Sequence, residues 1–80
     1  MNDVIEVRYV RDHILWLRFQ DGTAGEIDLR PSLKGRVFEP LHNIDYFKLV
    51  RVDPEIGTIV WPNGADIAPE TLFDRLHVAV

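Results

Sequence analysis

The chain has 80 residues, 46% of them hydrophobic, which predicts a single domain over residues 1–80 that hides roughly 60% of its unfolded surface. It contains no cysteine, which excludes disulfides and zinc–thiolate sites and favours the cytoplasm. Its net charge of −4 makes direct nucleic-acid binding unfavourable, because phosphate backbones are repelled on average.

The first part of the chain shows the two-residue period of β-strands. Between residues 4 and 29 the apolar side chains fall mainly on odd positions, as in Ile5 and Leu15. Turn-forming residues at 11–12 and 21–22 divide this segment into three strands. The pattern therefore predicts an antiparallel meander with the odd positions facing the core.

The loop between the second and third strands determines their register. A two-residue loop would pair Leu17 with Glu26 and place an acid on the core face. A loop of residues 20–22 instead pairs Leu17 with Gly25, and it gives Gly22 the left-handed conformation that a three-residue hairpin requires. We therefore predict the three-residue loop.

The middle of the chain predicts a connector and then a second hairpin. Residues 37–41 are too short for more than one helical turn, so we expect them to carry Phe38 and Leu41 into the core. Residues 47–53 and 58–61 are rich in β-branched and aromatic side chains, and the segment between them has turn chemistry. We expect Val52 opposite Thr58, Val50 opposite Val60, and at least partial cover on both faces of this hairpin.

The segment of residues 61–70 is the most tightly specified part of the sequence. Asn63 and Gly64 predict a tight turn, and Pro69 suits the first position of a helix, where a missing N–H costs little. The helix expected over residues 69–77 must pack on the sheet to persist. Together these elements predict an α+β fold with a three-stranded antiparallel meander, a short connector, a second β-hairpin and one C-terminal helix packed on the sheet.

Several stretches of the chain match a known family. They are Phe19-Gln20-Asp21-Gly22, the connector Val37-Phe38-Glu39-Pro40-Leu41, Phe47, and the block from Trp61 to Leu72. With these residues the chain resembles, over essentially its whole length, a small bacterial family known as domain of unknown function 2442.

The resemblance implies a small α+β domain and brings no catalytic residue with it. Relatives stand alone or are joined to a helix-turn-helix, and some are suspected members of toxin–antitoxin-like pairs. The chain leaves no room for a DNA-binding helix pair, so we expect any transcriptional role to need a partner.

Residues Asp66 and Glu70 form the carboxylate pair that most resembles a ligand site. Four residues across a turn can bring two acids together for a divalent metal or a small molecule, with Trp61 as one wall. The structural alternative is that Asp66 hydrogen-bonds free backbone N–H groups at the helix start while Trp61 anchors the core. His13 and His42 lack the spacing of a zinc site, as does His77, and no cofactor is predicted.

The second face of the meander predicts an interface. Ile14 and Trp16 project from the face opposite the core side chains, and Val4 and Val10 are expected on the same face of the neighbouring strand. An exposed apolar face of this kind marks an interaction surface for a protein partner or a second copy of the chain. The alternative is that the connector around residues 37–38 or the C-terminal helix covers it.

These observations narrow the function classes. No apolar run approaches the ~20 residues that a membrane span needs, and the first residues lack the regions of a signal peptide. We expect a cytoplasmic protein without membrane or direct nucleic-acid contacts. The sequence favours a non-enzymatic protein-interaction module, such as an antitoxin-like partner of a neighbouring small protein, over a ligand-binding domain.

Overall fold

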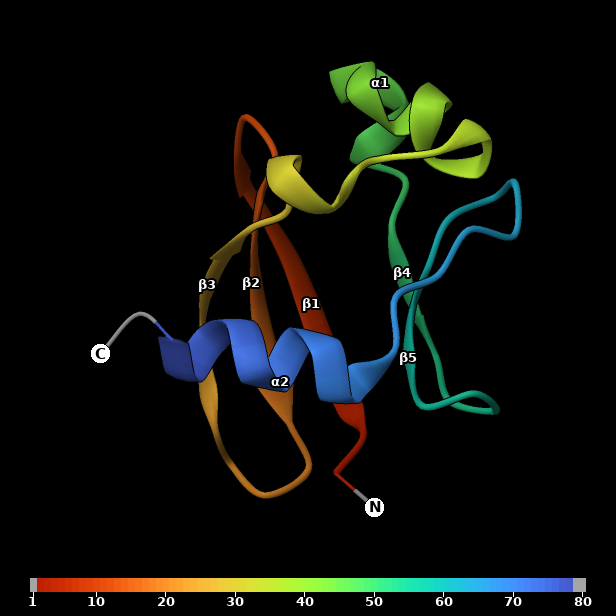
Figure 1. Ribbon diagram of the computed structural model, residues 1–80. Coiled ribbons are helices and arrows are strands. Elements are labelled where there is room, and N and C mark those ends of the chain that lie inside the picture. Colours follow the sequence, from red (N-terminus) through yellow and green to blue (C-terminus); the bar gives the residue numbers. More distant parts are fainter. Residues whose placement is uncertain (1, 79–80) are drawn as a thin grey trace.

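The structure is an α+β arrangement of a three-stranded sheet, a two-stranded hairpin and helices (Figure 1). This computed structural model describes the backbone of residues 2–78 and the side chains of residues 2–76. The elements in chain order are β1 (Val4–Arg11), β2 (Ile14–Phe19), β3 (Ala24–Asp28), the 3-10 helices η1 (Arg30–Ser32) and η2 (Arg36–His42), α1 (Ile44–Phe47), β4 (Arg51–Asp53), β5 (Thr58–Val60) and α2 (Pro69–Val78). The predicted meander, second hairpin and C-terminal helix are confirmed.

The core lies on one face of the sheet, which α2 crosses (Figure 1). Leu15 and Leu17 on β2 are fully buried on this face, and Leu72 of α2 is buried as well. The ring of Phe73 meets the ring of Phe19 edge to face, with 5.2 Å between the centroids. The predicted packing of α2 on the sheet is confirmed.

The β2–β3 hairpin has the predicted register. Leu17 pairs with Gly25, and the loop consists of residues 20–22, because the amide of Phe19 donates to the carbonyl of Thr23 at 2.8 Å. Gly22 has φ 91°, the left-handed conformation that this loop requires. Local turn chemistry and the alternating pattern agree here, so short-range information was sufficient.

Strand β1 departs from strict alternation, because its pairing with β2 shifts between Val4 and Glu6. Val4 pairs with Phe19 in the core, whereas Ile5 is pushed outward and is 44% exposed. The prediction of Ile5 as a core residue is therefore wrong. A bulge adds one residue to one strand and reverses the faces of the residues on either side of it.

Leu41 is fully buried and Phe38 packs against the core, as expected. The prediction of no more than one helical turn here is wrong, because the connector forms the seven-residue 3-10 helix η2. Phe47, however, ends the helix α1 instead of starting a strand, and β4 begins only at Arg51. The side chain of Asn43 accepts a hydrogen bond from the amide of Asp45 at 2.9 Å and caps this helix. The cap outweighs the β propensity of the residues that follow.

The second hairpin differs by one residue from its predicted register. Val52 pairs with Ile59, and Asp53 pairs with Thr58. The loop ends at Gly57, which has φ 70° and whose amide donates to the carbonyl of Asp53 at 2.8 Å. All of β5 is buried, so the predicted cover on both faces is confirmed for this strand.

The segment of residues 61–70 forms the predicted joint between β5 and α2. The amide of Trp61 donates to the carbonyl of Ala65 at 2.9 Å, and Gly64 has φ 86° in the turn between them. The helix begins at Pro69, as predicted.

The burial of Trp61 leads to a stability prediction with a matched control. Trp61 is 1% exposed, so Trp61→Ala should lower the free energy of unfolding by about 3–5 kcal/mol through lost burial and a cavity. Trp16→Ala removes the same side chain from a partly exposed strand position and should cost about 1 kcal/mol. Urea denaturation followed by circular dichroism measures both, and equal losses would contradict Trp61 as the anchor.

Candidate functional site

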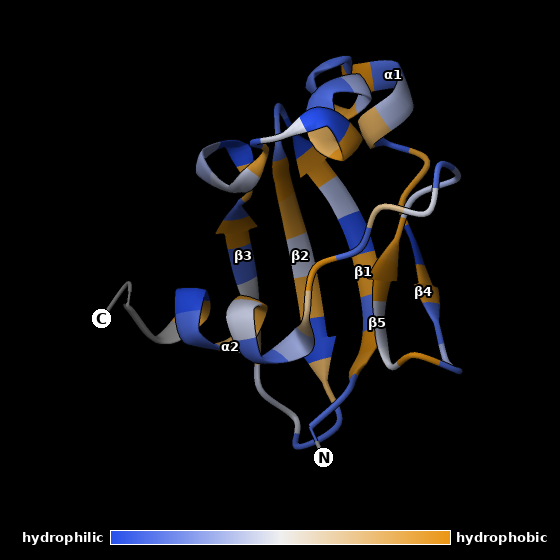
Figure 2. Cartoon of the chain, turned by 45° about the vertical axis from the view of Figure 1, so that its right-hand side comes forward, coloured by the Kyte–Doolittle hydropathy of each residue, from blue (hydrophilic) through white to orange (hydrophobic). Residues whose placement is uncertain are grey.

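The face of the sheet opposite α2 is not covered by any helix or strand of residues 2–78 (Figures 1 and 2). We call it the outer face. Strand register places three cross-strand rows on it. Its residues are Glu6, Arg18 and Ala24 in the first row, Arg8, Trp16 and Glu26 in the second, and Arg11, Ile14 and Asp28 in the third.

Only part of the predicted apolar interface lies on this face. Ile14 and Trp16 lie on it, as expected, and both side chains are partly buried. Val4 is not, because the bulge at Ile5 turns it into the core, where it is 1% exposed. Val10 lies at a second register shift of β1 and is paired with no β2 residue. The expectation of an apolar second face is therefore wrong, since charged side chains surround Ile14 and Trp16.

Glu6 organises the arginines around Trp16. Its carboxylate accepts a hydrogen bond from Nε of Arg8 at 2.9 Å and two from Nε and Nη2 of Arg18 at 3.1 and 3.0 Å. These bonds hold the pKa of Glu6 below its ordinary value. The hydrogen bond from Arg8 has the largest effect, and the bonds from Arg18 come next. The Arg8 guanidinium lies 5.3 Å from the centroid of the Trp16 ring, in cation–π range. The outer face is therefore a preformed network of charges around one tryptophan.

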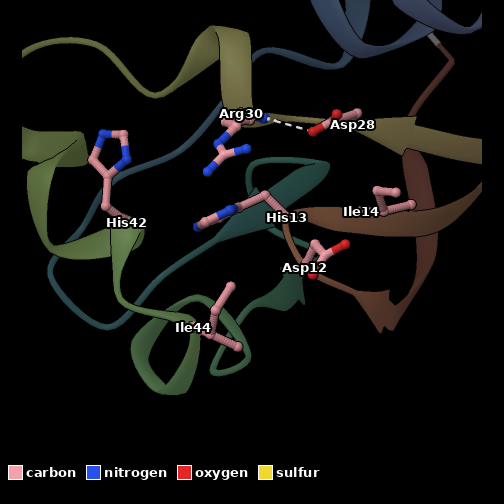
Figure 3. Close-up of a pocket in the computed structure, with 7 residues that line it drawn as sticks. All are labelled: Asp12, His13, Ile14, Asp28, Arg30, His42 and Ile44. Carbon is pink, nitrogen blue, oxygen red and sulfur yellow. Dashed lines mark hydrogen bonds between the residues drawn. The ribbon is translucent and has the colours of Figure 1, made fainter.

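A polar cavity of about 420 Å³ lies at the end of the sheet (Figure 3). The β1–β2 turn, the start of β2, the end of β3 and the connector all contribute to its wall. The lining residues are Asp12, His13, Ile14, Asp28, Arg30, His42 and Ile44.

The two histidines of the cavity each hydrogen-bond a backbone carbonyl through Nε2. Nε2 of His13 lies 3.0 Å from the carbonyl oxygen of Leu41, and Nε2 of His42 lies 2.8 Å from that of Leu33. A carbonyl oxygen only accepts hydrogen bonds, so we assign the proton of each neutral ring to Nε2. Nδ1 of each ring is then an acceptor with no partner among the described residues.

Sequence reasoning missed this pair of histidines. His13 and His42 share no motif spacing, yet their ring centroids lie 6.2 Å apart, because η2 folds back onto the β1–β2 turn. The side chain of His77 lies outside the described residues. Within the described part of the chain, no group of three or more His, Asp or Glu residues could hold a metal ion.

The alternative ligand site at residues 61–70 is not assembled. Trp61 is buried and its Nε1–H donates to the carbonyl of Phe47 at 2.9 Å, so it anchors the core and forms no wall of a site. Glu70 lines a separate hollow of about 210 Å³ that includes neither Trp61 nor Asp66. The hollow beside Glu70 therefore does not combine the three predicted residues.

Asp66 also does not cap the helix as expected. It is exposed, and its backbone forms an isolated antiparallel bridge with Val60. No described residue donates a hydrogen bond to its carboxylate, and α2 begins after Ala68, whose carbonyl accepts from the amide of Leu72 at 3.2 Å. The bridge keeps Asp66 in an extended segment before the helix, which explains the wrong prediction.

Fold and surface together define a small α+β domain with a charged, tryptophan-centred sheet face and a polar cavity at the sheet end. The chain belongs to the family described as "Protein of unknown function (DUF2442)", whose model matches residues 4–77. No curated protein and no solved structure matches it significantly. Within residues 2–78 no helix has the length and apolar character that a bilayer crossing needs.

The Glu6 network makes a prediction about pH. Because the folded-state pKa of Glu6 is lowered, its contribution to stability is present above the ordinary pKa of a glutamate and is lost as pH falls through the lowered pKa. Carbon-detected NMR titration of the Glu6 carboxyl should show a midpoint below the ordinary value. Arg8→Gln should raise that midpoint, and Arg18→Gln should raise it less.

High salt should also raise the Glu6 midpoint, because solvent ions screen exposed pairs. Lys34→Gln, which removes an exposed charge outside the network, is the control and should leave the midpoint unchanged. A midpoint at the ordinary value in the unaltered protein would show that the network does not form in solution.

Proposed function

We propose that this protein is a cytoplasmic, non-enzymatic protein-interaction module that binds a partner protein through its outer face. The partner is a neighbouring small protein, and the chain acts as the antitoxin-like member of the pair. The observation that carries the proposal is the middle row of the outer face, where Trp16 lies between Arg8 and Glu26.

The residue types of this row are those that provide binding energy at protein interfaces. Tryptophan and arginine are enriched among the few interface residues that cost more than about 2 kcal/mol when truncated. Trp16 is partly buried, and the arginines beside it, Arg8 and Arg18, are exposed. A partner that covers Trp16 and these two arginines would desolvate the indole together with both guanidinium groups.

The network also lowers the cost of binding. Glu6 holds Arg8 and Arg18 in place before any partner arrives, with bonds of 2.9 to 3.1 Å. Ordering a long side chain at an interface costs about 0.5–1.5 kcal/mol, and a side chain that is already ordered avoids much of that cost. A rigid β-sheet face with preformed charge pairs is thus suited to a specific partner.

The outer face carries equal numbers of positive and negative side chains. Its specificity for a partner therefore comes from the arrangement of these charges and not from an excess of one sign. Arg8, Arg11 and Arg18 stand against Glu6, Glu26 and Asp28. The net charge of −4 therefore resides elsewhere on the chain and would speed the encounter with a basic partner.

Loss of Trp16 should disrupt the complex without unfolding the domain. The chain is co-expressed with the product of the adjacent gene, and affinity is measured by isothermal titration calorimetry. Trp16→Ala should weaken binding by more than about tenfold, and Arg18→Glu should do the same by breaking the network. If the partner is a second copy of the chain, both variants should shift sedimentation toward the monomer.

Glu70→Ala is the control for this experiment, because Glu70 is exposed on α2 and lies on the other side of the sheet. It should bind like the unaltered protein. The proposal fails if the unaltered chain is a monomer that does not bind the neighbouring protein at micromolar concentrations. It also fails if the complex forms equally well with both outer-face variants.

A further inference from the structure

The polar cavity holds charges of both signs that do not pair with one another. Arg30 contributes a guanidinium, and Asp12 and Asp28 contribute carboxylates. The ion pairs among the described residues all involve Glu6, so none of these three groups is neutralised by another. Figure 3 shows the Arg30 side chain directed toward His13, away from the Asp28 carboxylate.

Backbone geometry, and not attraction to Arg30, positions the two acids. Oδ1 of Asp28 accepts the backbone N–H of Arg30 at 3.0 Å, which leaves Oδ2 available. Asp12 has φ 47°, a left-handed conformation that Asp and Asn tolerate better than most residues. The hydroxyl of Tyr9 donates to the Asp12 carbonyl at 3.0 Å and supports this conformation.

The rest of the lining adds acceptors and an apolar wall. Nδ1 of His13 and Nδ1 of His42 are acceptors without a partner among the described residues, because each ring donates through Nε2 to a backbone carbonyl. Ile14 and Ile44 provide aliphatic surface. The cavity therefore offers one strong donor group, several acceptors and a hydrophobic wall.

We propose that this cavity binds a small zwitterion, a free aliphatic amino acid, with its carboxylate on Arg30 and its ammonium among Asp12, Asp28 and the histidine Nδ1 atoms. Arginine binds carboxylates with two parallel hydrogen bonds. The aliphatic side chain of the ligand contacts Ile14 and Ile44. The volume of about 420 Å³ lies in the range of small-molecule sites.

A ligand with a single charge fits less well. A simple anion would pair with Arg30 but would bring a second negative charge toward Asp12 and Asp28. A simple cation would satisfy the acids but would leave Arg30 covered and without an acceptor. A ligand of both signs provides a partner for each charged group of the lining, which neither a simple anion nor a simple cation does.

The test is a titration of the full chain with L-leucine, followed by two-dimensional ¹H–¹⁵N NMR. Saturable shifts are expected at the amides of Asp12, His13 and Arg30. Leucinamide lacks the carboxylate, and 4-methylpentanoate lacks the ammonium. Each analogue should bind at least about tenfold more weakly, the loss expected for one charged hydrogen-bonded group.

Variants identify the groups that bind each end of the ligand. Arg30→Gln should weaken leucine binding by about tenfold or more and abolish the preference for leucine over leucinamide. The double variant Asp12→Asn, Asp28→Asn should abolish the preference for leucine over 4-methylpentanoate. Asparagine keeps the acceptor for the Arg30 amide and tolerates the left-handed conformation, so the fold should be retained.

Arg36→Gln is the matched control, since Arg36 is an exposed arginine of the connector outside the lining. It should bind leucine unchanged, as should Trp16→Ala, which separates this inference from the proposed protein interface. The inference is overturned if leucine causes no saturable shift at millimolar concentrations. It is also overturned if 4-methylpentanoate or leucinamide binds as well as leucine, which would indicate an anion site or a cation site.

Discussion

The contact between Trp61 and Phe47 joins the segment after β5 to the end of the helix α1. The indole N–H donates to the Phe47 carbonyl at 2.9 Å, and the two rings lie 5.7 Å apart. The Phe47 ring also contacts the rings of Tyr9 and His13, at 6.2 and 4.8 Å between centroids. One buried cluster thus connects the joint after β5, the helix α1 and the sheet, and the connector takes its position from it.

The position of the connector creates the cavity. His13 donates to the carbonyl of Leu41 and holds η2 against the β1–β2 turn, and His42 donates to the carbonyl of Leu33 and ties η2 to the segment before it. Each imidazole therefore satisfies a backbone acceptor that would otherwise be left near the core without a partner. The same bonds direct the Nδ1 atoms away from those carbonyls, so the side chains that hold the connector are also available for the proposed ligand.

The two proposed binding surfaces meet at the end of the sheet. Ile14 and Asp28 belong both to the third row of the outer face and to the lining of the cavity. The groups that characterise each surface remain distinct, with Trp16 and the Glu6 network on the sheet and Arg30 and the histidines in the cavity. The arrangement follows from the topology, because Ile14 and Asp28 form the last row of the sheet, at the end where Arg30 and the two histidines complete the lining.

Sequence by itself determined what depends on short-range chemistry: the α+β class, the β2–β3 register with its loop at Gly22, and the start of α2 at Pro69. Tertiary structure decided the rest. The bulge at Ile5 moved Val4 into the core, and the bridge of Asp66 to Val60 removed it from the helix start. The histidine pair arose from the return of the connector. Such features depend on contacts between residues that are not neighbours in sequence, and the energies of those contacts exceed the small local preferences that a sequence pattern reports.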